Sequence, residues 1–240
     1  MKLLVAIKAV RPELENVKES DGKAESVLVM DPFSEVALAA ALQLKKNSGI
    51  VSEVVALTVA LESAEPVLRT ALALGADRAT RVDVQAETPQ QATQAMLPVV
   101  EQETPQLVLL GKQSSDGDHR QTGAMLATRL SYPFADGVES LTLSPSQAQV
   151  VRRTEWHELE QQLTLPAVLS ADLRLAEPGF AALPQLLKAR RMPIKHRSPA
   201  GSLATAPELE QARAEVTRQP QQVADVASLI SKLKTEARVL

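Results

Sequence analysis

The sequence predicts an α/β fold: a doubly wound, mainly parallel sheet with helices on both faces, an antiparallel extension and a C-terminal arm. Up to residue 130, short apolar runs alternate with amphipathic helical patterns, and the connections between them are short. This alternation is typical of βαβ units. Beyond residue 135, strand-like runs follow one another without helices between them.

Four apolar runs in the first half have the length and β-branched content of strands that are buried on both faces. They span residues 2–10, 52–60, 78–84 and 106–111. Because each is followed by a helical pattern, they are expected to lie parallel in one sheet.

Helical patterns fill the intervals between these runs, and capping residues mark their ends. Asp31 is a natural N-cap and Pro32 fits the first helical position, an arrangement that Thr88 and Pro89 repeat. Pro98 lies inside the third pattern and predicts a kink or a break. The expected helices span 31–49, 63–76, 88–103 and 124–130.

Three runs with alternating character predict the antiparallel extension. They read GVESLTLS, AQVVRRTEW and QQLTLPAVLSADL. We therefore expect residues 1–191 to form one α/β domain, of the kind and size that commonly binds nucleotides.

The remaining residues, 192–240, are expected to form an arm that ends in one helix. Proline, serine, alanine and glutamine are frequent up to Pro220, as in segments that do not build a core. Val223, Val226, Ile230 and Leu233 then recur at helical spacing. This stripe needs a cover, which is either its own domain or a partner subunit.

Composition excludes several functional classes. The net charge of −3 argues against broad electrostatic binding of nucleic acid, and the absence of cysteine excludes disulfides and thiolate chemistry. The first apolar run is too short for a signal sequence, and no stretch reaches the length of a membrane span. We expect an intracellular protein.

No pattern in the chain indicates self-sufficient catalysis. His119, His157 and His196 are scattered and have no metal-ligand spacing. The sequence contains neither a G-x-S-x-G turn nor a P-loop, and no G-x-G-x-x-G follows the first strand. We therefore expect no catalytic residues, no metal site and no enzyme activity of its own.

One segment stands out, LVLLGKQSSDGDHRQTG at residues 107–123, where an apolar run gives way to glycine, serine and charged residues. Ligands of open α/β sheets bind beyond the carboxyl ends of the strands, and a following helix N-terminus favours phosphate. Gln121 and Thr122 can donate to phosphate oxygens, and Arg120 adds a charge. The segment is either a nucleotide phosphate site of a Rossmann-like domain or a polar loop without a ligand.

Several stretches together resemble the beta subunit of electron-transfer flavoprotein. They are LLVAIKAV, DPFSEVALAAALQLK, RTALALGADRA, GKQSSDGDHRQTGAM, LTLPAVLSADLRLAEPGFAALPQLLKARRMP and ADVASLISKLKTEARV. They occur in the order of the family and span almost the whole chain.

The resemblance implies a non-catalytic subunit of an electron carrier. Such a subunit binds AMP and pairs with an alpha subunit that holds most of a redox-active FAD. The heterodimer accepts electrons from flavin dehydrogenases and passes them to a quinone reductase. It would reside in the cytoplasm of a bacterium or in the mitochondrial matrix of a eukaryote.

The resemblance also implies site residues. The AMP contacts of the family map onto Ala6, Asp31, Pro32, Phe33, Ser34, Val59, Gly111, Lys112, Gln113, Ser114, Ser115, Asp116, Gly117, Asp118, His119, Arg120, Gln121 and Thr122. Phe33 would also lie near the FAD of the alpha subunit. The family's dehydrogenase-docking block maps onto Leu183, Pro184, Leu186, Leu187, Lys188, Arg190 and Arg191. The competing interpretation of that block is an ordinary amphipathic helix with Leu183 in the core.

The chain departs from the family at several positions. Asp31 replaces a common asparagine, and Arg153 replaces a glutamate that steers the flavin domain, so that role is not transferred. Asp116-Gly117-Asp118 is a pattern of electron-bifurcating relatives, which bind a second FAD in place of AMP. The alternatives are therefore a bifurcating flavoprotein subunit and a stand-alone adenine-nucleotide-binding regulator.

Overall fold

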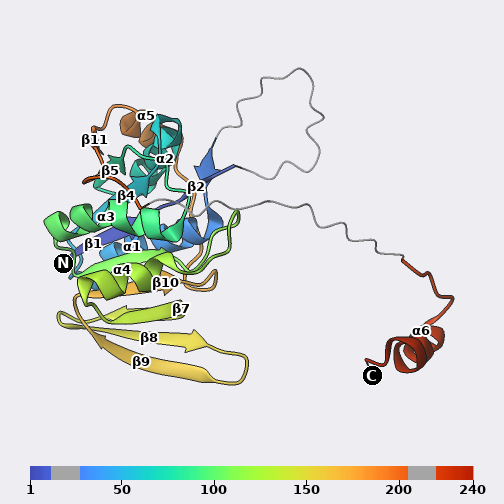
Figure 1. Cartoon of the computed structure of the whole chain (residues 1–240). Helices are drawn as coiled ribbons and strands as arrows, with labels where there is room; N and C mark the ends of the chain where they lie inside the picture. Colours follow the sequence, from blue (N-terminus) through green and yellow to red (C-terminus); the bar gives the residue numbers. More distant parts are fainter. Residues whose placement is uncertain (12–27, 205–219, 240) are drawn as a thin grey trace, which may run out of the picture. The chain divides into compact units, whose positions relative to one another are not determined.

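A computed structural model describes residues 1–11, 28–204 and 220–239 of the chain. Within these residues, nine strands form one sheet in the order β11-β5-β4-β1-β6-β10-β7-β8-β9 (Figure 1). Its parallel strands are β1 (Lys2–Ala6), β4 (Glu53–Val59), β5 (Arg78–Val82), β6 (Leu107–Gly111), β10 (Ala167–Ala171) and β11 (Ile194–Arg197). The α/β class expected from the sequence is confirmed.

The antiparallel part of the sheet consists of β7 (Phe134–Leu143), β8 (Gln147–Arg153) and β9 (Glu158–Thr164). β7 is parallel to β10 on one side and antiparallel to β8 on the other. A separate two-stranded sheet pairs β2 (Ala9–Val10) with β3 (Val29–Met30). The first predicted strand, 2–10, is therefore two strands: β1 ends at Ala6, and β2 belongs to the small sheet.

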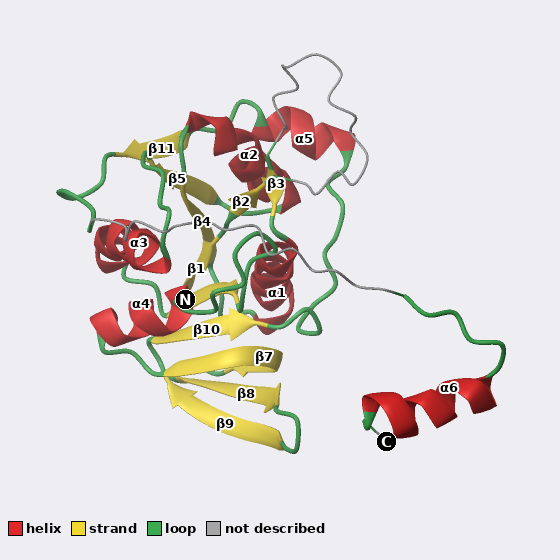
Figure 2. Ribbon diagram, turned by 45° about the vertical axis from the view of Figure 1, so that its right-hand side comes forward, coloured by secondary structure: helices red, strands yellow, loops and turns green. Residues whose placement is uncertain are grey.

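Helices cover both faces of the sheet (Figure 2). They are α1 (Pro32–Ser48), α2 (Glu65–Leu74) after the 3₁₀ turn Glu62–Ala64, α3 (Pro89–Glu103), α4 (Thr122–Leu130) and α5 (Leu183–Ala189). Alternate residues of β1 divide the core, since Leu3 and Val5 pack with α1 and α2 whereas Leu4 packs with α3 and α4. α5 packs on α2.

The helix ends follow the predicted chemistry. The Asp31 side chain accepts a hydrogen bond from the Phe33 backbone N–H, and Gly49 ends α1 with a left-handed φ of 67°. Thr88 caps α3 in the same manner through the Gln91 N–H. α3 runs through Pro98 to Glu103, so the predicted break is wrong.

The third predicted strand of the extension, QQLTLPAVLSADL, is two strands of opposite character. Pro166 separates β9 from β10, because proline has no N–H to donate to a central strand. β9 is the exposed antiparallel edge, whereas all five residues of β10 are buried between β6 and β7. Only the first half of that run therefore belongs to the antiparallel extension.

The segment expected to leave the domain at Met192 first adds the edge strand β11, which pairs with β5. By contacts the chain divides into two units, Met1–Ala206 and Pro207–Leu240. The second unit contains α6 (Val226–Lys232), which continues into a π-helical turn at Leu233–Ala237. Residues 205–219 of the predicted arm lie outside the described residues.

Val226 and Ile230 of the predicted apolar stripe lie in α6, whereas Val223 precedes the helix and Leu233 begins the π-helical turn. No residue of this helix is buried, and Val226, Leu229 and Ile230 are exposed. Across the described ranges, no helix is both long and apolar enough to cross a membrane.

Candidate functional site

A cleft lies beyond the carboxyl ends of β1, β4 and β6, where the sequence predicted a ligand. The predicted residues that line it are Ala6, Ser34, Val59, Gly111, Lys112, Gln113, Ser114, His119, Arg120, Gln121 and Thr122. Its volume is about 160 Å³, which is below the roughly 300–1,000 Å³ of most small-molecule sites. A complete nucleotide would therefore displace side chains at its rim.

Three helices direct their N-termini at this cleft. Ser34 belongs to the first turn of α1, Thr88 caps α3, and Thr122 begins α4. The side chains of Asp31 and Thr88 cap α1 and α3, but Gln121 makes no capping hydrogen bond at α4. The first amides of α4 are thus without a side-chain cap, and they face a cleft with three positive helix ends.

The loop between β6 and α4 is tied to α1 by Asp31. This residue is completely buried, and its Oδ2 accepts hydrogen bonds from the Ser115 backbone amide (2.7 Å) and hydroxyl (2.9 Å). Its Oδ1 accepts from Phe33 N–H at 3.0 Å. Both carboxylate oxygens are engaged within the protein, so Asp31 acts on the cleft by holding the loop.

The glycines of this loop have packing reasons. A Cβ on Gly111 would lie 2.6 Å from the Cβ of Phe33, and one on Gly123 would lie 3.0 Å from the Phe134 ring. Gly111 therefore lets the first turn of α1 approach the end of β6. The sequence-based explanation, room for an anion beside the backbone, is not needed for these two glycines.

The cations of the cleft are each paired with an aspartate. Lys8 Nζ lies 2.5 Å from Asp116, and Arg120 Nη2 lies 2.9 Å from Asp136. Lys112 Nζ lies 2.5 Å from Asp172 and 5.8 Å from the centre of the Phe33 ring. About half of the Lys8 and Arg120 side chains is exposed, so each can reach an incoming anion if it exchanges its aspartate for that anion.

Burial and these pairings act oppositely on two of the aspartates. Burial is the largest single influence on Asp116 and raises its pKa, but the hydrogen bonds from Lys8 and Ser114 and the charge of Lys8 together outweigh it, so the pKa lies below its usual value. Burial also acts most strongly on Asp172, but the hydrogen bonds from the Lys112 side chain and the Arg174 backbone, with the charges of both residues, together lower its pKa. Both carboxylates are therefore ionised at neutral pH and hold their lysines at the cleft.

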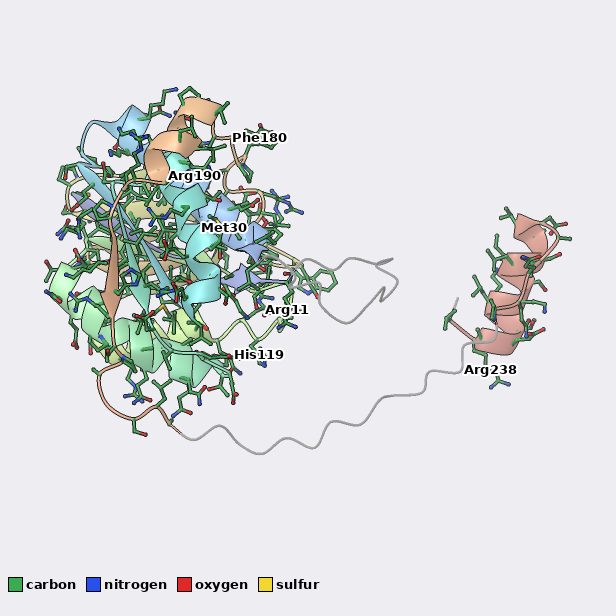
Figure 3. All side chains as sticks on the ribbon, turned by 90° about the horizontal axis from the view of Figure 1, so that it is seen from above. Arg11, Met30, His119, Phe180, Arg190 and Arg238 are labelled. Carbon is green, nitrogen blue, oxygen red and sulfur yellow. The ribbon has the colours of Figure 1, made fainter. Side chains whose placement is uncertain are left out.

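The backbone of the loop is strained near its tip. Asp118 and Arg120 have positive φ angles of 49° and 55°, a left-handed conformation that costs energy for residues with a side chain. His119, between them, lies at the exposed end of the loop (Figure 3).

The remaining predicted residues do not line the cleft. Pro32 and Phe33 form the first turn of α1 beside it, and Ser115 to Asp118 form the outer part of the loop. Ser115 and Asp116 still contribute, because they fix the loop through Asp31 and Lys8.

One wall of the cleft was not predicted. It consists of residues from the β5–α3 connection and from α3, together with neighbours of predicted residues, namely Ala86, Glu87, Thr88, Pro89, Ala92, Met96, Ile7, Lys8, Leu110 and Gly123. The sequence signal that could have indicated this wall is the Thr-Pro start of α3, which follows a parallel strand. In the described ranges, no three histidine, aspartate or glutamate residues could together hold a metal ion.

The predicted docking block forms α5 and the turn after it. Leu183 begins the helix and is 68% exposed, Leu187 is 52% exposed and Leu186 is 39% exposed. Phe180 is fully exposed and projects from the domain beside α5 (Figure 3). The competing interpretation, with Leu183 in the core, is therefore wrong.

The fold and cleft define a doubly wound α/β protein with a ligand-type cleft at the carboxyl edge of its sheet. A family model described as the electron transfer flavoprotein domain matches residues 24–202. Over the full length of both chains, the sequence is 37% identical to the mitochondrial electron transfer flavoprotein subunit beta of Oryza sativa subsp. japonica. It is equally similar to the subunit beta of Bradyrhizobium diazoefficiens.

The human electron transfer flavoprotein subunit beta is 35% identical and is covered over 99% of its length. The chain therefore belongs to the family of electron transfer flavoprotein beta subunits. The names of these relatives describe subunits of an electron transfer flavoprotein, and they include a mitochondrial and a bacterial form.

Proposed function

We propose that this chain is the beta subunit of a heterodimeric electron-transfer flavoprotein and that it binds AMP in the cleft described above. An alpha subunit holds most of the FAD. The heterodimer accepts electrons from flavin dehydrogenases and delivers them to a quinone reductase, and this chain has no catalytic residue of its own. Its compartment is the cytoplasm of a bacterium or the mitochondrial matrix.

The observation that carries the nucleotide proposal is the start of α4. Its N-cap, Gln121, makes no capping hydrogen bond, although α1 and α3 beside it are capped. A phosphate at Thr122 would accept from these amides and lie at the positive end of the helix. Lys8 and Arg120 lie at the same rim and can exchange an aspartate for the phosphate.

The size of the cleft supports AMP rather than FAD. A volume of about 160 Å³ is small even for a mononucleotide, and a dinucleotide would require a much larger displacement of the rim. The Asp116-Gly117-Asp118 sequence favours the alternative, a bifurcating subunit with a second FAD. None of these three residues lines the cleft, which weakens that argument.

α5 supports the docking part of the proposal. Its exposed leucines form an apolar patch, and Lys188, Arg190 and Arg191 follow directly. An apolar anchor beside several cations fits a transient partner with an apolar pocket and an acidic rim. The alternative of a stand-alone nucleotide-binding regulator does not explain such a surface.

Purification of the heterodimer followed by acid extraction tests the proposal. We expect one FAD and one AMP per heterodimer. Two FAD molecules would establish the bifurcating alternative, and a colourless monomer that binds nucleotide reversibly would establish the regulator.

Thr122→Val tests the site itself. Loss of a hydrogen bond to a charged phosphate costs about 1.5–3 kcal/mol, so AMP affinity should fall by roughly ten-fold or more. Thr128→Val is the matched control, because Thr128 is an exposed residue of the same helix and its hydroxyl donates to Ala124 O. Equal AMP content and melting temperature in both variants would exclude Thr122 as a ligand.

A further inference from the structure

α5 has little of its own to hold it in place. It is seven residues long, and only Ala189 at its C-terminal end is buried. Isolated helices shorter than about 12–15 residues are marginal in water. Because the three leucines face solvent, contacts elsewhere must fix the orientation of this helix.

Arg69 of α2 supplies such contacts at the C-terminal end of α5. Its Nη1 donates to the carbonyl oxygen of Ala189 at 2.9 Å and also to that of Met192. Carbonyl groups in the last turn of a helix have no partner within the helix, and a cation there also interacts favourably with the helix dipole. Arg69 therefore binds both the last turn of α5 and the turn that follows it.

Glu65 in turn orients Arg69. Glu65 Oε1 accepts from Arg69 Nε at 3.2 Å and from Nη2 at 2.7 Å, one helical turn away on α2. The hydrogen bond from Arg69 lowers the pKa of Glu65 despite some burial, so the pair is charged at neutral pH. With Nε and Nη2 bound to Glu65, Nη1 points at α5, and lysine cannot reproduce this fork.

We infer that Arg69 is a positioning residue for the docking surface: it anchors α5 by its C-terminal end and so leaves Leu183, Leu186 and Leu187 exposed in a fixed orientation. This inference rests on the proposed docking function of α5. A surface that is already ordered loses less conformational entropy when a partner binds. Arg69 lies on α2 and contacts the backbone of α5, so its substitution leaves the leucine side chains of the docking surface unchanged.

The experiment compares Arg69→Gln with wild type in the purified heterodimer. Limited trypsin digestion is followed at Lys188, Arg190 and Arg191, all at the C-terminal end of α5. Reduction of the bound flavin is followed with a flavin dehydrogenase of the same organism that reduces the wild-type heterodimer. Arg129→Gln is the matched control, because Arg129 is an exposed arginine near the end of helix α4.

We expect cleavage at the three sites to accelerate at least ten-fold in Arg69→Gln. The heterodimer concentration at half-maximal reduction rate should rise at least five-fold, while the maximal rate and the FAD and AMP contents stay at the wild-type level. Arg69→Lys keeps the charge and the aliphatic part of the side chain. Its cleavage rate and half-saturating concentration should lie between those of wild type and Arg69→Gln. Arg129→Gln should match wild type in every measurement.

Unchanged cleavage in both Arg69 variants would overturn the inference. Faster cleavage with an unchanged half-saturating concentration would show that Arg69 holds α5 in place. It would also show that α5 is not the docking surface, and Arg69 would then have no positioning role in docking. Leu183→Ala separates the two failures, because it should raise the half-saturating concentration without accelerating cleavage.

Discussion

Asp31 and Ser115 are joined by two hydrogen bonds to one carboxylate oxygen, although they lie 84 positions apart in the chain. Asp31 is buried, and its second oxygen caps α1. One side chain thus fixes the start of a helix and the loop that forms the rim of the cleft. Because a buried carboxylate is tolerated only when its hydrogen bonds are satisfied, the loop and the helix depend on each other.

Asp31→Ala should destabilise the protein by about 2–4 kcal/mol. It removes an N-cap, typically about 1 kcal/mol, and two further bonds to a charged group. The freed loop should also lower AMP content. Ser115→Ala, which keeps the backbone bond and loses only the hydroxyl, should cost about 1 kcal/mol. Equal melting temperatures for the two variants would show that Asp31 does not hold the loop.

Gly111→Ala should destabilise through a steric clash. The new Cβ would lie 2.6 Å from Phe33 Cβ and 3.1 Å from Gln113 O, so α1 and β6 must separate. Overpacking of this kind costs about 1–3 kcal/mol. Gly179→Ala is the control, since nothing lies within 4 Å of its added Cβ. A melting temperature of Gly111→Ala at the level of Gly179→Ala would contradict the explanation.

The sequence predicted those elements whose signals are local. β4, β5 and β6 are continuous apolar runs, and Asp31-Pro32 and Thr88-Pro89 are capping sequences that act within a few residues. The loop 111–122 was predicted as a ligand site because it follows a buried strand and precedes a helix. Its position at the cleft was expected because ligands of parallel sheets bind beyond the carboxyl ends of the strands.

What the sequence did not predict depends on strand order. The wall of the cleft from Ala86 to Pro89 requires β5 and β6 to lie on opposite sides of β1 and β4, which no local pattern states. The place of β10 in the centre of the sheet and of β11 at its edge are likewise products of long-range pairing. Arg69 and Ala189 lie 120 positions apart in the chain, and no local sequence pattern predicts their contact.

A charged cluster at the amino-terminal ends of the strands predicts a pH dependence. Glu103 is buried at the end of α3. Its Oε2 accepts hydrogen bonds from Arg78 Nη2 at 2.8 Å and from Lys2 Nζ at 3.1 Å. The hydrogen bond from Arg78 is the main cause that lowers its pKa to about 2. The ionised form is therefore favoured by folding, and this stability is complete above about pH 4.5 and is lost as the pH falls toward 2.

Glu103→Gln should lower stability at pH 7 by about 2 kcal/mol, a value reduced from the full pKa shift because Arg78 is partly exposed. The difference in melting temperature from wild type should shrink as the pH falls from 4.5 toward 2. AMP content should not change, since the cluster lies at the opposite edge of the sheet from the cleft. Glu101→Gln, an exposed neighbour on α3, should show no such dependence. A difference that is constant with pH would contradict the assignment.

The C-terminal unit is predicted to bind the alpha subunit. Within its own unit, α6 exposes Val226, Leu229 and Ile230 on one side, and an exposed apolar stripe of this kind is typical of a contact surface. Removal of residues after Ala206 should raise the dissociation constant of the heterodimer at least ten-fold at matched salt. Full-length Val226→Ser/Ile230→Ser should reproduce much of this effect. Equal affinity of the full-length and shortened chains, measured by sedimentation, would exclude the tail from the interface.

Leu183 is predicted to be the main anchor for the dehydrogenase. Leu183 is 68% exposed at the first position of α5, so truncation of its side chain removes little burial within this chain. Leu183→Ala should weaken coupling to the dehydrogenase by about 1–3 kcal/mol, the range of interface hot spots. Flavin reduction by the dehydrogenase should slow at low concentration, whereas reduction by dithionite, FAD and AMP contents and melting temperature should match wild type. Leu159→Ala is the control, because Leu159 is an exposed leucine of β9, the strand at the other edge of the sheet. If Leu159→Ala weakened coupling as much as Leu183→Ala, the loss would reflect exposed apolar area in general, and α5 would not be the docking surface.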